Sequence, residues 1–314
     1  MNKQKQYRNS SNRYIYRILV SILISMRPKQ WSKNLLVFFA LLFSIQESWD
    51  VQIWSSVESM LINSILAFFV FSIVSGAIYL INDVLDYEKD RVHPSKSIRP
   101  VASGRLSKSI AQIATLAFLI PAIIAAFIIN MNFGWIIVGY VALMISYSMV
   151  LKNYVLVDCF AITAGFVLRA IAGATVVDVP ISLWLYLCTG LGALVIALAK
   201  RRSELTNSGD KAQLQRSNLK SYSLKLIDNV AILTIFATVI AYTAYTFTAP
   251  NLPDNKLMTL TIPMVVYGLL RYAYLVHFKS LGESPEDLLL SDKHLFMTVV
   301  IWIASTALIL ILFR

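Results

Sequence analysis

Apolar runs long enough to cross a lipid bilayer recur along almost the whole chain. A membrane-spanning helix needs about 20 predominantly apolar residues, and the hydropathy pattern predicts nine such segments, of which the first is short. These segments cover residues 34–46, 57–82, 109–130, 132–151, 155–177, 181–200, 226–248, 257–277 and 295–313. The pattern predicts an all-α, polytopic membrane bundle of about nine transmembrane helices.

No stretch of soluble character divides these segments, so we expect a single transmembrane domain over residues 1–314. Residues 1–26 form a polar and interfacial N-terminal segment within it. Its second half, residues 14–26, is apolar with scattered arginine and is predicted to lie along the membrane interface before Pro28.

The composition supports the membrane assignment. Hydrophobic residues make up 57% of the chain and charged residues only 14%, whereas an ordinary soluble domain carries about 25% charged residues. The formal net charge of +11 would suit a nucleic-acid partner only if a basic soluble module were present. No such module exists, so nucleic-acid binding is excluded and membrane topology must explain the charge.

The basic residues orient the bundle. Of the 28 Lys and Arg, 24 fall in the N-terminal segment and in alternate loops, and cytoplasmic loops of membrane proteins collect positive residues. This places the N-terminus in the cytoplasm of a protein integral to the cell (inner or plasma) membrane. The two large loops on the same side, residues 82–108 and 200–225, hold most of the polar sequence. We therefore expect the active site to face the cytoplasm.

The second segment ends in a cluster of acidic residues, with Asn82 and Asp83 followed by Asp86 and Asp90. On a continuous helix the three carboxylates would share one face, where they repel one another. A bound divalent cation removes that cost, and ligands that are all oxygens suit Mg²⁺. The cluster predicts a Mg²⁺ site formed by Asn82, Asp83, Asp86 and Asp90. The alternative is that the acids only pair with basic residues in a solvated loop.

Cations follow these acids in the loop, notably Lys96 and Arg99. Lys and Arg beside a metal site are what a diphosphate needs, because the metal neutralises only part of its charge. The alternative reading is the positive-inside bias alone. Another cation, Arg169, does not lie in a loop but in the middle of an apolar segment, where it must face a cavity or a partner.

The acidic residues resemble the first motif of the UbiA-type superfamily of intramembrane prenyltransferases. That motif, N-D-x-x-D-x-x-x-D, matches Asn82, Asp83, Asp86 and Asp90, and a following R-P matches Arg99-Pro100. The resemblance implies a helical bundle around a central cavity that opens laterally to lipid. It also implies that Mg²⁺ holds the diphosphate of a substrate there.

The second family motif, another D-x-x-x-D, is altered to Lys200-Arg201-Arg202-Ser203-Glu204-Leu205. This pattern resembles the decaprenyl-phosphate phosphoribosyltransferase branch, whose K-R-x-x-E-L matches Lys200, Arg201, Glu204 and Leu205. Other similar segments are residues 27–34, 147–148, 151–153 and 169–173. The resemblance implies transfer of 5-phosphoribose from 5-phosphoribosyl 1-diphosphate to a polyprenyl phosphate, with release of diphosphate.

The implied roles divide among a few sets of residues. Asp83, Asp86 and Asp90 are the candidate catalytic residues, and with Asn82 they are the candidate Mg²⁺ ligands. The candidate substrate-binding residues are Lys96, Arg99 and Lys152 for the diphosphate, Lys200 and Arg201 with Glu204 for the 5-phosphate, Lys29 and Lys33 for the lipid phosphate, and Tyr147, Asn82 and Arg169 around them.

Two other functions remain open from the sequence. A conventional prenyltransferase would move a prenyl group from a prenyl diphosphate to an aromatic or lipid acceptor, but the missing second acidic motif argues against it. A transporter of a charged solute would also place polar residues within the membrane. It would leave the acidic cluster unexplained.

Overall fold

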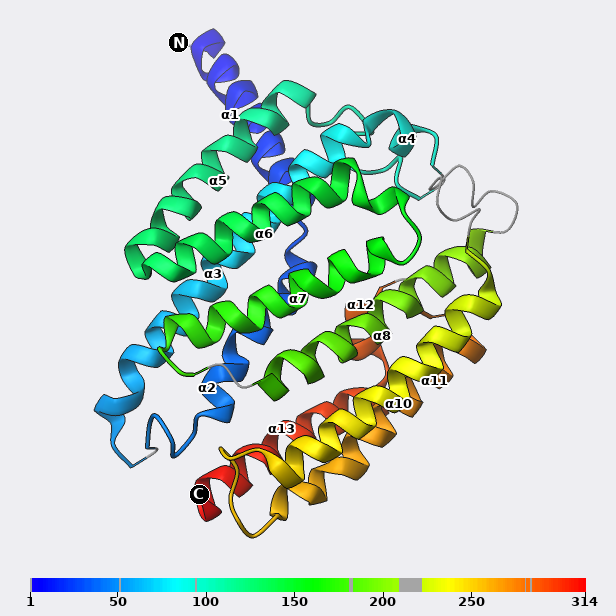
Figure 1. Ribbon diagram of the computed structural model, residues 1–314. Helices are drawn as coiled ribbons and strands as arrows, with labels where there is room; N and C mark the ends of the chain where they lie inside the picture. Colours follow the sequence, from blue (N-terminus) through cyan, green and yellow to red (C-terminus); the bar gives the residue numbers. More distant parts are fainter. Residues whose placement is uncertain are drawn as a thin grey trace.

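The computed structural model describes residues 2–50, 52–93, 95–180, 183–208, 222–279, 281–282 and 284–314, and these form helices with no strand. Eight helices in this part of the chain are long and apolar enough to cross a membrane, which confirms the predicted polytopic bundle (Figure 1). They lie within α3 (Trp54–Leu85), α5 (Lys108–Ile129), α6 (Met131–Met149), α7 (Val157–Val176), α8 (Leu183–Ser208), α10 (Leu224–Thr248), η5 with α11 (Leu257–Thr261 and Ile262–Lys279) and α13 (Lys293–Phe313).

The first predicted segment forms a different kind of helix. Residues 34–46 fall in a 3₁₀ helix, η1 (Pro28–Phe38), followed by the short α2 (Phe39–Phe43). A 3₁₀ helix rises about 2.0 Å per residue, so 11 such residues span about 22 Å. The five α-helical residues add roughly 7.5 Å, giving about the thickness of the hydrocarbon core.

Contacts at both ends of this segment show that it runs the length of the bundle. Arg27, just before η1, pairs with Asp83 at the end of α3. Beyond α2, the carbonyl oxygens of Phe43 and Ile45 accept hydrogen bonds from Arg314, the last residue of the chain. The described residues thus contain eight helices that could cross a membrane, and η1 with α2 occupies the place of the short first segment predicted from the sequence.

Helix α7 packs closely against η1. Gly173 allows the two backbones to touch, because a Cβ at this position would overlap the carbonyl oxygen of Val37. One helical turn earlier, Arg169 donates a hydrogen bond to Oδ1 of Asn34 at 2.8 Å. The amide of Asn34 in turn donates to Ser72 of α3 at 3.0 Å. Polar and backbone contacts therefore fix η1 between α3 and α7.

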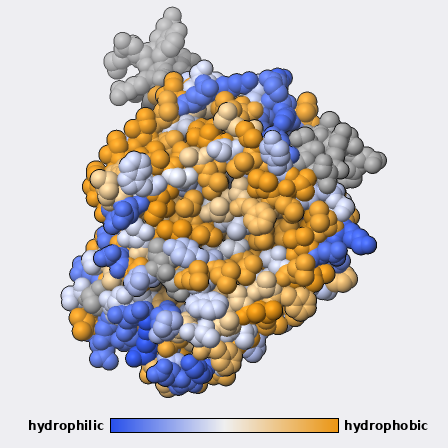
Figure 2. Space-filling view, viewed as in Figure 1, coloured by the Kyte–Doolittle hydropathy of each residue, from blue (hydrophilic) through white to orange (hydrophobic). Residues whose placement is uncertain are grey.

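Apolar side chains fill the bundle and cover its sides. One cluster of buried residues, which includes Val37, Phe71, Val74, Phe133 and Ile137, joins η1 to α3 and α6. Hydrophobic residues also cover most of the face seen in Figure 2, and hydrophilic residues gather toward the ends of the helices. This surface suits a protein whose sides face lipid.

The N-terminal segment is a helix, α1 (Asn2–Ser25), in place of the shorter entry helix predicted over residues 14–26. Ile18 and Ile22 of α1, with Met26, pack against Leu80 of α3. Its position along the membrane interface stays a prediction, as does the single domain over residues 1–314.

The predicted cytoplasmic loop 200–225 is partly helical. Helix α8 continues to Ser208, so Lys200, Arg201 and Glu204 lie on its last turns. Arg201 is fully buried and pairs with Glu204 one turn later, and this contact favours continuation of the helix. Residues 209–221 of the loop lie outside the described part of the chain.

Candidate active site

The acidic motif lies at a break between two helices. Asn82 and Asp83 occupy the last turn of α3, which ends at Leu85, and Asp90 lies in the short α4 (Tyr87–Arg91). Asp86 sits at the break, with φ −93° and ψ 8°. The three acids therefore lie on two helices and the residue between them, and not on one continuous helix. Asp86 contacts a different partner from that of Asp83 and Asp90.

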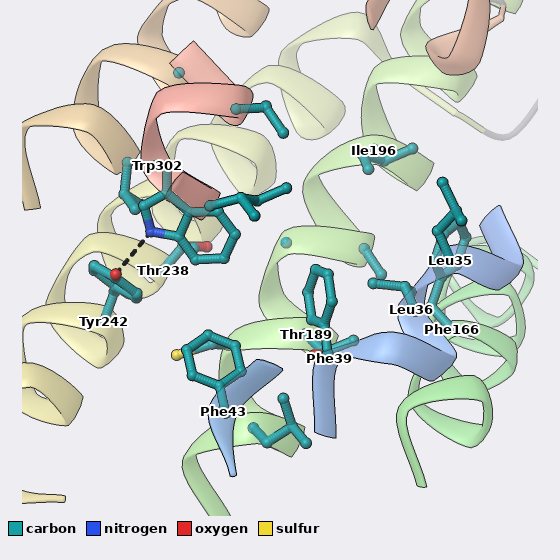
Figure 3. A pocket seen from close by; sticks show the side chains of 18 of the residues that line it. Leu35, Leu36, Phe39, Phe43, Phe166, Thr189, Ile196, Thr238, Tyr242 and Trp302 are labelled. Atoms are coloured by element: carbon teal, nitrogen blue, oxygen red, sulfur yellow. Dashed lines mark hydrogen bonds between the residues drawn. The ribbon is translucent and has the colours of Figure 1, made fainter. Parts of the chain in front are cut away.

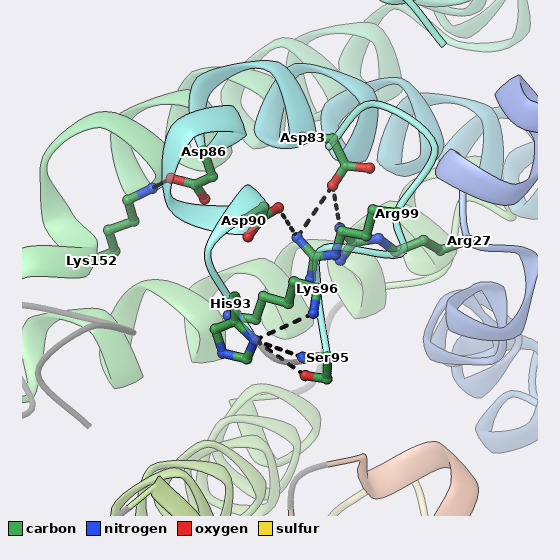
Figure 4. A network of polar contacts seen from close by, with 9 residues as sticks. All are labelled: Arg27, Asp83, Asp86, Asp90, His93, Ser95, Lys96, Arg99 and Lys152. Atoms are coloured by element: carbon green, nitrogen blue, oxygen red, sulfur yellow. Dashed lines mark hydrogen bonds and ion pairs between the residues drawn. The ribbon is translucent and has the colours of Figure 1, made fainter. Parts of the chain in front are cut away.

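Asp83 and Asp90 are joined by arginines. Nη1 of Arg99 lies 2.6 Å from Oδ2 of Asp90 and 3.4 Å from Oδ1 of Asp83. Nη2 of Arg27 lies 2.5 Å from the same Asp83 oxygen (Figure 4). Asp83 and Asp90 are only 1% and 4% exposed, and buried carboxylates need such partners.

Asp86 pairs instead with Lys152, whose Nζ lies 2.7 Å from Oδ1. Lys152 comes from η2 (Leu151–Asn153), the turn between α6 and α7. Lys96 lies in the same loop as Arg99, and its backbone amide donates to Nδ1 of His93 at 3.3 Å. The structure thus brings together five predicted residues, Asp83, Asp86, Asp90, Arg99 and Lys152, with Lys96 beside them (Figure 4). We call this group the acidic cluster.

Two buried oxygens, one in the acidic cluster and one on the residue before it, have no hydrogen-bond partner. Oδ1 of Asn82 and Oδ2 of Asp83 are buried and accept no hydrogen bond, although buried polar atoms ordinarily have a partner. Mg²⁺ takes oxygen ligands of this kind. Among the described residues, no three His, Cys, Asp or Glu side chains gather as a ready-made metal site, since Arg99 bridges two of the acids and Lys152 holds the third.

A second cluster surrounds Arg201. Its Nε lies 2.7 Å from Oδ2 of Asp158, its Nη1 pairs with Glu204, and its Nη2 donates to the hydroxyl of Tyr147 at 3.2 Å. Tyr222 donates to the other Asp158 oxygen at 2.6 Å, and burial raises the pKa of Tyr222, which keeps it protonated as a donor. Arg201 is thus paired with two carboxylates and a tyrosine hydroxyl.

The two clusters are neighbours in the chain. Lys152 of the acidic cluster lies six residues before Asp158 and five after Tyr147, which both contact Arg201. The end of α6, the turn after it and the start of α7 therefore supply side chains to the two clusters. Lys200 precedes Arg201 on α8, and its role as a phosphate ligand stays a prediction.

A large apolar cavity lies along η1. Its volume is about 1030 Å³, and its walls come from η1, α2, α7, α8, α10, α11, α12 (Pro285–Ser291) and α13. Leu35, Leu36, Phe39, Phe43 and Trp302 point into it in Figure 3. Cavities of this character bind apolar ligands.

The two lysines predicted for the lipid phosphate differ in position. Lys33 lines the cavity, where it pairs with Glu286 of α12 at 3.4 Å. Lys29 is exposed near the start of η1. Arg169 lies apart from both clusters and holds η1 through Asn34, and it also donates to Tyr140 at 2.7 Å. Its contacts indicate that it positions η1.

The structure adds site residues that the sequence interpretation missed. Arg27 joins the acidic cluster, and the only signal was its place at the head of the segment 27–34. Gln30 donates to Glu286, and both contact Lys33. The 256 residues that separate Gln30 from Glu286 hide this pairing from any local pattern.

The chain is similar to known proteins in sequence and in fold. Residues 35–300 match the UbiA prenyltransferase family. The chain is 31% identical over 291 residues to a decaprenyl-phosphate phosphoribosyltransferase of Mycobacterium tuberculosis, covering 92% of this chain and 93% of that protein. It is 32% identical over 299 residues to the protein of that name from Mycolicibacterium smegmatis, covering 91% and 92%.

A solved structure shares the fold. The UbiA homolog from Archaeoglobus fulgidus, bound to GPP and Mg²⁺, superposes with a TM-score of 0.69 at 19% identity and covers 92% of this chain and 99% of that one. The apo UbiA homolog from Aeropyrum pernix superposes with a TM-score of 0.59 at 13% identity, covering 90% and 98%. The chain is therefore an integral membrane enzyme that belongs to the UbiA prenyltransferase family.

Proposed function

We propose that this enzyme transfers 5-phosphoribose from 5-phosphoribosyl 1-diphosphate to a polyprenyl phosphate and releases diphosphate. The observation that carries the proposal is the course of η1. This helix begins beside the acidic cluster, through Arg27, and continues along the apolar cavity, through Lys33. Lys33 follows Arg27 by six residues, which cover about 12 Å in a 3₁₀ helix. One short helix therefore links the charged acidic cluster to the apolar cavity.

The acidic cluster suits the diphosphate of the donor. Asn82, Asp83, Asp86 and Asp90 would hold Mg²⁺, which would neutralise part of the charge on the leaving diphosphate. A metal on these carboxylates would free the cations that now pair with them, Arg27, Arg99 and Lys152. Those cations are then placed to hold diphosphate oxygens as negative charge grows on them.

The apolar cavity suits the chain of a polyprenyl lipid, with Lys33 at its charged end. The names of the similar mycobacterial proteins support a lipid phosphate as the acceptor. A lipid phosphate brings its own nucleophilic oxygen, which is ionised at neutral pH. The enzyme then needs no activated Ser, Cys or His, and its task is to bring two anionic substrates together.

The donor has a second anionic group, the 5-phosphate. Lys200 and Arg201 occupy the position of the second acidic motif of the family. We therefore assign the 5-phosphate to the end of α8 that carries them. Lys200 is the phosphate ligand in this assignment. Arg201, which pairs with Asp158 and Glu204, holds this turn of α8 in place. We place both clusters at the cytoplasmic face, in keeping with the distribution of basic residues.

Removal of Mg²⁺ is expected to stop the reaction. Purified protein supplied with 5-phosphoribosyl 1-diphosphate and polyprenyl phosphate should release diphosphate only when both substrates and Mg²⁺ are present. EDTA should reduce the release to the level without protein, and excess Mg²⁺ should restore it. Diphosphate release that continues in EDTA would refute the metal assignment. Release from a prenyl diphosphate, with none from the phosphoribosyl donor, would favour conventional prenyl transfer instead.

A further inference from the structure

Three side chains close the seam between η1 and α12 at the charged end of the apolar cavity. Lys33 donates to Gln30 on η1, Gln30 donates to Glu286 on α12, and Lys33 also lies 3.4 Å from Oε2 of Glu286. We call this ring of contacts the η1–α12 clasp. It joins the first crossing segment to the helix just before the last one.

The clasp leaves polar atoms inside the cavity wall without hydrogen bonds. The Glu286 side chain is 6% exposed, and its Oε2 accepts no hydrogen bond, although Nζ of Lys33 lies 3.4 Å away as an ion-pair partner. Tyr272 of α11 lines the same cavity, is 8% exposed, and its hydroxyl has no hydrogen-bond partner. Burying a polar group without a hydrogen bond is costly. The site is therefore incompletely satisfied by the protein alone.

A lipid phosphate would satisfy this site better than Glu286 does. A phosphate monoester carries more negative charge than a carboxylate and more acceptor oxygens, so it is the stronger partner for an ammonium group. It could take Lys33 from Glu286 and also accept the unpartnered Tyr272 hydroxyl. The lipid chain would then lie along the apolar wall that begins with Leu35 and Leu36.

We propose that Glu286 is a specificity-determining residue that occupies Lys33 until the phosphate of the acceptor lipid displaces it, and that Tyr272 binds this phosphate. The inference rests on the proposed function, since it takes a polyprenyl phosphate as the acceptor. A neutral polyprenol lacks the anion needed to displace Glu286. The clasp thus makes the cavity select lipids that carry a phosphate.

Binding of the lipid alone tests the inference without any transfer reaction. Glu286→Gln keeps an oxygen that accepts from Gln30 but removes the charge that competes for Lys33. We expect it to tighten the binding of polyprenyl phosphate by about three- to tenfold, as expected for removal of a nearby like charge. Tyr272→Phe should weaken binding by about threefold or more, because one hydrogen bond is lost. Tyr274→Phe is the matched control on the same helix, since Tyr274 is 43% exposed, and should not change it.

Native mass spectrometry or intrinsic fluorescence of the full-length protein in detergent would give the dissociation constants. The same titrations with neutral polyprenol and with inorganic phosphate separate the lipid chain from the anion. Neutral polyprenol should not respond to Glu286→Gln, whereas inorganic phosphate, which lacks the chain, should bind more weakly than polyprenyl phosphate and respond in the same direction. Unchanged affinity for polyprenyl phosphate in folded Glu286→Gln protein would overturn the inference, and so would equal tightening for neutral polyprenol. If the lipid binds as expected but no phosphoribose is transferred, only the proposed function fails.

Discussion

Asp83→Asn protein is expected to fold and to lose transfer by about 10²–10³-fold, the scale of losing one group that stabilises developing charge. The substitution keeps the size of the side chain and removes its charge. Asp83 is 1% exposed, pairs with Arg27 and Arg99, and has a second oxygen with no hydrogen bond. Its neutral replacement would both weaken the metal site and leave two arginines without their shared partner.

The matched control is Glu88→Gln in the adjoining helix α4. Glu88 is 77% exposed and lies 3.4 Å from Lys108 on the surface, where such a pair contributes little to stability. Initial rates of diphosphate release, with the melting temperature of each variant, make the comparison. Full activity in folded Asp83→Asn protein, or an equal loss in Glu88→Gln protein, would contradict the site.

Gly173→Ala is expected to destabilise the protein by about 1–3 kcal/mol, the usual cost of inserting a methyl group into a packed interior. A Cβ at this position meets the carbonyl group of Val37, which is backbone and cannot rotate away. Helix η1 would have to shift away from α7. Because η1 links Arg27 to Lys33, transfer should fall as well, even at temperatures where the protein remains folded.

Gly139→Ala in α6 controls for the change of residue type, because a Cβ at this position meets no atom within 4 Å. Its melting temperature should stay the same or rise, since alanine favours helices more than glycine does. Thermal unfolding in detergent and transfer rates below the transition would be measured for both variants. If Gly173→Ala melted and reacted like the unchanged protein, the contact between η1 and α7 would not hold the site together.

The sequence predicted the features that depend on local patterns. Runs of apolar residues located the long helices, because each span must be apolar along its own length. The spacing of Asp83, Asp86 and Asp90 located the acidic cluster. The pairing of the loop residue Arg99 with two of these acids was only the alternative interpretation of the cluster.

Features that depend on contacts between distant segments could not be predicted in this way. Helix η1 contacts Gly173 and Arg169, which lie more than 130 residues away along the chain. Hydropathy alone gave a short helix there. The break at Asp86 likewise accompanies its contact with Lys152, 66 residues later.

The η1–α12 clasp and the buried pairing of Arg201 could not be predicted from the sequence either. A lysine or arginine next to an apolar segment has the same appearance in the sequence whether it is solvated or paired inside the bundle. Glu286 pairs with Lys33, and Asp158 with Arg201, only because the fold brings their helices together.

The mass of the lipid product tests the central claim most directly. Purified protein would receive polyprenyl phosphate, Mg²⁺ and 5-phosphoribosyl 1-diphosphate labelled with ¹³C in the ribose, and the lipids would be extracted for mass spectrometry. We predict a new lipid whose mass equals that of polyprenyl phosphate plus one labelled phosphoribosyl group, formed in equal amount to the diphosphate released. The account would be contradicted if no lipid carried the label and if a prenylated product formed when a prenyl diphosphate replaced the donor.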